Sequence, residues 1–75
     1  MANVELLKEK IKDSGMTMVA ISKKSGIERA TLYKKLNDNE EKRPEFTATE
    51  IVNLSNVLRL TRAERDKIFL SSNVN

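Results

Sequence analysis

The sequence has no cysteine and no histidine among its 75 residues. Without cysteine there is neither a disulfide framework nor a thiolate metal site. Without histidine the commonest metal ligand and general base is missing, and the acids fall on predicted solvent faces or in a charged loop. We therefore predict that the chain is not an enzyme. It is expected to have no catalytic residues and to need no metal, cofactor or small-molecule substrate.

Long apolar runs are also absent, so the sequence predicts no transmembrane span and no signal-peptide core. Only Tyr33, Phe46 and Phe69 are aromatic, which is too few to anchor a membrane-surface helix. Together with the missing thiols, these absences favour a cytoplasmic protein without a membrane partner. The length indicates one domain over residues 1–75, in which packed apolar helix faces must supply the stability.

The net charge of +3 is unevenly divided along the chain. Residues 1–37 carry eight Lys or Arg and four Asp or Glu, a net charge of +4. Residues 38–75 carry six and seven, a net charge of −1. A polyanion-binding face would have this asymmetry, but so would a lysine-rich solvated surface. Charge alone leaves both interpretations open.

The basic half contains a stretch, residues 17–36, that reads as two short helices joined by a turn. Helices over 18–24 and 28–36 flank Ser25-Gly26, where glycine permits a positive φ. In the second helix Leu32 and Leu36 are one turn apart and predict a buried face. The remaining positions are predicted to point outward: Glu28, Arg29, Thr31, Lys34 and Lys35. A helix of this size fits the DNA major groove.

Three more helices are predicted, which makes the chain all-α with five short helices and no strand pattern. One covers residues 3–13, with Asn3 as its cap and Ser14-Gly15 as its stop. The other two, at 47–59 and 61–70, each begin with a capping box, Thr47-Ala48-Thr49-Glu50 and Thr61-Arg62-Ala63-Glu64.

The segments between and after these helices are polar. Residues 37–45 are predicted to form an exposed loop, in which Lys42 and Arg43 either touch DNA backbone or are simply solvated. Residues 71–75 are predicted to be a frayed polar tail. The apolar residues 68–70 are candidates for the core or for a contact in a homodimer.

A helix-turn-helix places the start of its second helix toward base edges. The predicted base-facing residues are Glu28, Arg29, Ala30, Tyr33 and Lys34. Arg29 matches the acceptors of guanine, Ala30 matches a thymine methyl, and Lys34 can reach a base or a phosphate. Glu28 either accepts from cytosine or only caps the helix. Tyr33 and Thr31 carry hydroxyls suited to phosphate oxygens. The cations expected to make binding salt-dependent are Lys23, Lys24, Arg29, Lys34 and Lys35.

Residues 17–36, in particular SGIERATLYKKLND at 25–38, resemble the helix-turn-helix of phage Cro/CI-like repressors. The run EFTATEIVNLSNVLRLTRAERDKIFL at 45–70 is similar to the helical tail of small Cro-like phage proteins, so that the resemblance covers about residues 4–70. It implies a λ-repressor-like DNA-binding domain that regulates transcription in a bacterial host, commonly as a dimer on a palindromic double-stranded operator. Thr17 and Asn37 would then contact the DNA backbone.

Three residues depart from the family pattern. Met18 stands where a Gln contacting DNA is frequent, Ser22 where Ala is usual, and Glu28 where a Ser or Thr cap is usual. The full set of predicted backbone contacts is Thr17, Met18, Thr31, Asn37, Lys42 and Arg43. Some small phage proteins of this kind are antirepressors that bind a partner repressor protein. An exposed Met18 beside Met16 would suit such an interface, so this remains the alternative function.

Overall fold

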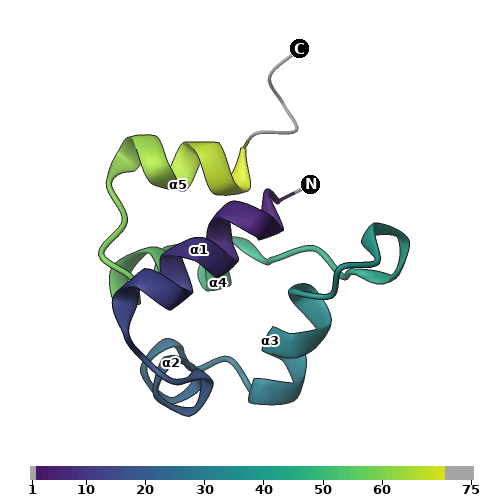
Figure 1. Cartoon of the computed structure of the whole chain (residues 1–75), viewed down its shortest axis with the longest axis horizontal. Helices are drawn as coiled ribbons and strands as arrows, with labels where there is room; N and C mark the ends of the chain where they lie inside the picture. Colours follow the sequence, from purple (N-terminus) through teal and green to yellow (C-terminus); the bar gives the residue numbers. More distant parts are fainter. Residues whose placement is uncertain (1, 71–75) are drawn as a thin grey trace.

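The computed structural model describes residues 2–70 (Figure 1). Within that range the chain forms no strand and five α-helices: α1 (Val4–Ser14), α2 (Met18–Ser25), α3 (Arg29–Lys35), α4 (Ala48–Val57) and α5 (Arg62–Phe69). A 3₁₀ turn, η1, spans Glu40–Lys42. The predicted all-α class with five helices is confirmed, whereas the tail predicted at 71–75 lies outside the described residues. None of the described helices is long and apolar enough to cross a membrane.

The helices begin where the sequence places their caps. The side chains of Asn3 and Thr17 each accept a backbone N–H at 3.1 Å, from Leu6 and Ala20. Both capping boxes are complete, with Thr47 and Thr61 each exchanging hydrogen bonds with the glutamate three residues later. The helix ends differ from the predicted ones by one or two residues, because capping residues lie outside the regular helical hydrogen bonds.

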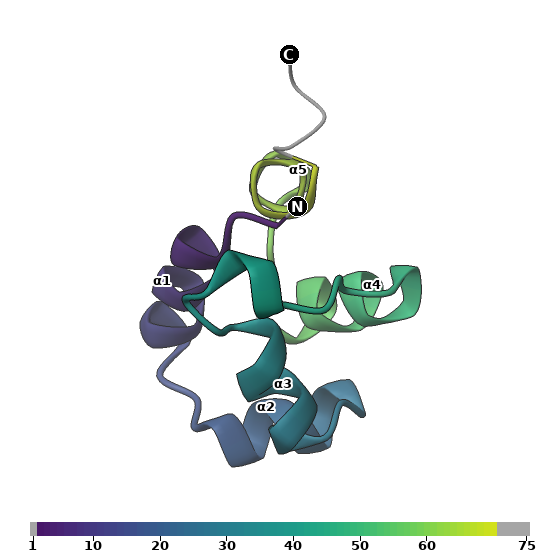
Figure 2. The same cartoon turned by 90° about the vertical axis from the view of Figure 1, so that its right-hand side faces the viewer.

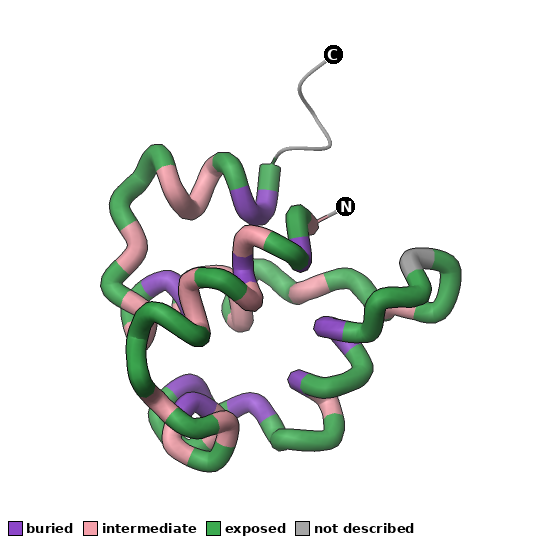
Figure 3. The backbone as a smooth tube through the Cα atoms, viewed as in Figure 1, coloured by how far each residue is buried: buried purple, intermediate pink, exposed green. Residues whose placement is uncertain are grey.

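Each helix contributes one fully buried aliphatic side chain to a single core. These residues are Leu7, Ile21, Leu32, Leu54 and Ile68, all at 0% exposure. Figure 3 colours the buried positions along the backbone. Phe69 is also buried, whereas Leu70 is 47% exposed. Of the three residues at 68–70, the first two therefore belong to the core of the chain itself.

The turn between α2 and α3 is fixed by short-range and long-range hydrogen bonds. Gly26 has φ +73°, and its N–H donates to the carbonyl of Ser22 at 2.9 Å. The hydroxyl of Ser22 donates to the carbonyl of Ile27 at 2.5 Å, so this residue bonds across the turn as well as being small. From α4, the amide of Asn53 donates to the carbonyl of Ser25 at 3.1 Å. The turn is thereby attached to α4.

Helix α4 ends in a Schellman motif with an unusual residue in its left-handed position. The N–H of Leu60 donates to the carbonyl of Ser55 at 2.9 Å, and that of Arg59 to Asn56 at 3.2 Å. Arg59 has φ +52°, a conformation that is usually left to glycine. A side chain with a Cβ is strained in this conformation.

We expect replacement of Arg59 by Gly to stabilise the protein by roughly 1 kcal/mol, because glycine adopts a positive φ without steric conflict. Urea unfolding followed by circular dichroism measures the change. Arg59→Ala is the matched control, since it removes the same charge but keeps the Cβ. Equal stabilisation by both variants would show that the gain comes from the lost side chain and not from the backbone.

Candidate nucleic-acid interface

Helices α2 and α3 lie at the end of the molecule opposite α5 (Figures 1 and 2). Leu32 and Leu36 of α3 are buried, at 0% and 7% exposure, as predicted. All five predicted base-facing residues are exposed: Glu28, Arg29, Ala30, Tyr33 and Lys34. Thr31 is half-buried at the edge of this surface. The chain thus presents a short polar helix on two buried leucines.

Glu28 occupies the N-cap position of α3, but its carboxylate accepts no capping hydrogen bond. Glu28 is thus the N-cap residue by position, with its backbone carbonyl accepting the N–H of Leu32 at 2.9 Å, but its side chain does not cap the helix. Its exposed side chain instead places a negative charge at the start of α3. An acid at this point favours a cytosine amino group and opposes phosphate.

Lys35 does not point outward, which corrects its predicted place among the solvent-facing cations. Its side chain is only 9% exposed and forms an ion pair with Glu50 of α4. Residue 35 lies three positions after Leu32 and directly before Leu36, so it shares the inner face of α3. Spacing alone did not predict its burial, because Arg29 lies three positions before Leu32 and is exposed. The burial of Lys35 depends on an acidic partner fifteen residues away, which was not evident from local pattern.

Among the residues that the structure describes, three ion pairs join the basic half of the chain to its acidic half. Lys8 pairs with Asp38, Lys10 with Glu64, and Lys35 with Glu50. Five cations of the basic half make no ion pair with any residue that the structure describes: Lys12, Lys23, Lys24, Arg29 and Lys34. Four of these five lie on α2 and α3. Within the basic half, the cations that lack a described acidic partner therefore lie mainly on these two helices.

The paired acids remain ionised well below neutral pH. The hydrogen bond from Lys10, helped by the backbone N–H of Thr61, lowers the pKa of Glu64 to about 2. Lys8 likewise lowers the pKa of Asp38. Burial opposes the ionisation of Glu50, but hydrogen bonds from Lys35 and Thr47 outweigh it and lower its pKa. At neutral pH these carboxylates are therefore charged and neutralise their partner lysines.

The predicted backbone contacts on α2 differ in exposure. Thr17 is exposed, and its hydroxyl is engaged as the cap of α2. Met18 is partly buried and packs on the core, as does Met16, whose sulfur lies 3.8 Å from the ammonium of Lys24. The expectation of an exposed methionine pair for a protein interface is therefore wrong. The apolar residue that α2 does expose is Val19, at 42%.

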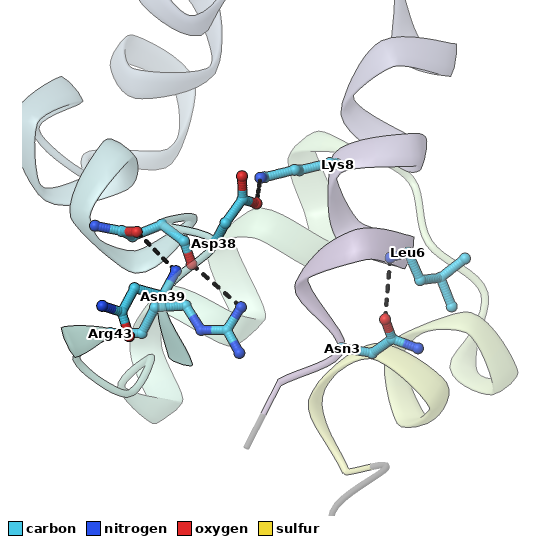
Figure 4. A network of polar contacts seen from close by, with 7 residues as sticks. Asn3, Leu6, Lys8, Asp38, Asn39 and Arg43 are labelled. Atoms are coloured by element: carbon cyan, nitrogen blue, oxygen red, sulfur yellow. Dashed lines mark hydrogen bonds and ion pairs between the residues drawn. The ribbon is translucent and has the colours of Figure 1, made fainter. Parts of the chain in front are cut away.

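The loop at 37–45 is largely exposed, as predicted, but its own hydrogen bonds organise it (Figure 4). The side chain of Asn37 accepts the N–H of Asn39 at 2.8 Å, and Arg43 donates to the carbonyl of Asn37 at 3.2 Å. The Lys8–Asp38 pair attaches the loop to α1. Arg43 thus contributes to the loop structure, and Lys42 is exposed at the end of η1.

The chain matches no protein-family model, no curated protein and no solved structure. Function therefore has to be argued from the residues themselves. The described residues contain no cluster of three or more acids that could hold a metal ion. Helices α2 and α3 expose the cations Lys23, Lys24, Arg29 and Lys34 and the phenol of Tyr33.

We expect Glu64→Gln to lower the free energy of unfolding at neutral pH. We also expect this free energy to change less with pH in acid than it does in the wild-type protein. Because the pKa of Glu64 falls from 4.5 to about 2 on folding, its stabilisation is complete above about pH 4.5 and is lost as pH falls toward 2. Glutamine keeps the capping box but removes the charge. Urea unfolding from pH 7 to pH 2 should show the two proteins converging at low pH.

The control is Glu45→Gln, at an exposed acid that makes no ion pair with any described residue. The free energy of unfolding of this variant should depend on pH in the same way as that of the wild-type protein. If Glu64→Gln also ran parallel to wild type over the whole range, the Lys10–Glu64 pair would contribute nothing to stability.

Proposed function

We propose that this protein is a sequence-specific regulator of transcription that binds double-stranded DNA, in the manner of a Cro-like repressor of a phage or mobile element. In this proposal the fold is a λ-repressor-like domain, α2 and α3 form a helix-turn-helix, and α3 enters the major groove. The DNA-binding surface consists of the exposed residues of α3 and the cations of α2.

The observation that carries the proposal is the distribution of unpaired charge. Lys8, Lys10 and Lys35 are neutralised within the fold, whereas Lys23, Lys24, Arg29 and Lys34 are not. The latter four lie on two helices that are in contact with each other. A phosphate backbone is the partner that such a group of cations recognises most strongly.

The chemistry of α3 supports sequence reading in addition to backbone binding. Arg29 is exposed at the start of the helix, where its guanidinium can make two hydrogen bonds to one guanine. Ala30 and Tyr33 add an apolar surface that matches a thymine methyl group. Lys34 and the hydroxyl of Thr31 suit phosphate oxygens. The buried pair Leu32 and Leu36 keeps these groups on the outer side.

The first test is the salt dependence of binding. A duplex is enriched by the protein from a random library of about 20 base pairs, a length that accommodates two half-sites. Its affinity is then measured by fluorescence anisotropy over a range of salt. With Lys23, Lys24 and Lys34 each neutralising a phosphate while Arg29 reads a base, the slope of log K against log salt should be about −3 for each bound protomer. Failure to enrich any duplex, or an affinity that does not change with salt, would contradict the proposal.

The second test concerns Arg29. Replacement by Ala should cost about 1–3 kcal/mol in binding and relax the preference at one base pair, because a bidentate guanine contact is lost. Arg62→Ala is the matched control, since Arg62 is exposed on α5 at the far end of the molecule (Figure 1). A uniform loss over all sequences would assign Arg29 to a phosphate.

A second candidate function is an antirepressor that binds a partner repressor protein through the same surface. Val19 and Tyr33 favour it, because these two large residues of α2 and α3 are 42% and 58% exposed. A pull-down with candidate repressor proteins, run next to a gel shift on the enriched duplex, separates the two. Binding to the protein alone would replace the first proposal with the second.

A further inference from the structure

We propose that α4 fixes the direction of α3 by holding the end of α2 and the end of α3, and that Lys35 is a positioning residue and not a DNA contact. The inference rests on the proposed function in one respect, since it assigns α3 as the helix that reads DNA. Two side chains of α4 form this support: Asn53, which binds the last residue of α2, and Glu50, which binds the last residue of α3.

Asn53 donates to the carbonyl of Ser25, the last residue of α2, where the turn toward α3 begins. At the end of α3, Glu50 accepts from the ammonium of Lys35. Glu50 and Asn53 are three residues apart and therefore lie on the same face of α4. Because α2 and the end of α3 are bonded to one face of the same helix, α3 cannot pivot about the turn without breaking the bond at Lys35.

Burial makes the attachment at Lys35 strong. Lys35 is 8% exposed as a residue, and the side chain of Glu50 is 17% exposed. An ammonium removed from water is costly unless it meets an anion. The ammonium also lies 5.7 Å from the ring centre of Phe46, within the range of a cation–π interaction. The ion pair and the cation–π interaction therefore hold the ammonium of Lys35 in place, and they hold the end of α3 with it.

One carboxylate oxygen of Glu50 accepts two hydrogen bonds. Oε1 of Glu50 accepts the N–H of Thr47 at 2.9 Å, which completes the capping box of α4, and it also accepts from Lys35. Phe46 packs edge-on against Phe69 of α5, with ring centres 5.5 Å apart. The end of α3 is thus joined both to the first turn of α4 and to an aromatic contact with α5.

A positioning residue and a phosphate contact respond differently to salt. Loss of a phosphate contact reduces the steepness of log K against log salt by about 0.9. Loss of a positioning residue misplaces the base contacts and leaves the number of phosphate contacts unchanged. The salt slope therefore separates the two roles even where both lower the affinity.

The test compares Lys35→Met with Lys34→Met on the duplex enriched by the wild-type protein. Methionine keeps the length and burial of the side chain and removes its charge. We expect Lys35→Met to bind about tenfold more weakly with an unchanged slope, which is the loss expected when one base contact is misplaced. Lys34→Met should reduce the slope. Unchanged affinity for Lys35→Met, or a reduced slope, would overturn the proposal.

A second variant tests whether a folding defect causes the loss of affinity. Lys35→Met leaves the carboxylate of Glu50 without its partner, so the double variant with Glu50→Gln removes both charges and keeps an acceptor for Thr47. Circular dichroism at the binding temperature verifies that both proteins are folded. The double variant should show the same loss of affinity at constant slope, and recovery of wild-type affinity would overturn the proposal.

The direction of α3 is also measured without DNA. Residual dipolar couplings of backbone amides in the double variant should show α3 reoriented, while α1, α2 and α5 keep their mutual orientation. An unchanged α3 would overturn the positioning role. If α3 reorients but the wild-type protein enriches no duplex, the positioning role stands and the DNA-binding proposal fails, so the two failures are distinguishable.

Discussion

An ammonium that is taken out of water has to meet an anion, and in this protein the arrangement of α3 depends on that requirement. Glu50 supplies the anion, and the same oxygen completes the first turn of α4. The formation of one helix and the placement of another are therefore coupled through a single carboxylate. Asn53 attaches the end of α2 to the same helix. The surface that α3 presents is consequently determined by α4, a helix that is not part of that surface.

The other ion pairs between the two halves of the chain determine where unpaired charge is left on the surface. Lys8–Asp38 and Lys10–Glu64 also join a lysine from residues 1–37 to an acid from residues 38–75, so the two halves of the chain neutralise each other where they touch. Exposed pairs contribute little stability individually. Their more important effect is on the charge that is left in the basic half, where four of the five cations without a described acidic partner lie on α2 and α3. A net charge of only +3 is thus compatible with a strongly basic local surface.

Local rules were sufficient to predict the helices and their caps. Thr47 and Thr61 begin capping boxes that need only four consecutive residues, and Leu32 and Leu36 identify the inner face of α3 by spacing alone. Lys35 was misplaced because its burial depends on a partner fifteen residues away, and polarity suggested a solvent position. The exposed base-facing set was predicted correctly as a surface. The roles of Glu50 and Asn53 were not predicted. The sequence indicated Glu50 only as part of a capping box and Asn53 only as an ordinary polar residue.

The five fully buried aliphatic side chains come one from each helix and share one centre. Detachment of any helix would expose these buried side chains to water, and no subset of the helices retains a complete core of its own. Small domains built in this way unfold in a single cooperative step. The two-helix unit that carries the proposed function is therefore not an independent module. It exists as a structured surface only as long as the first and last helices of the chain remain in place.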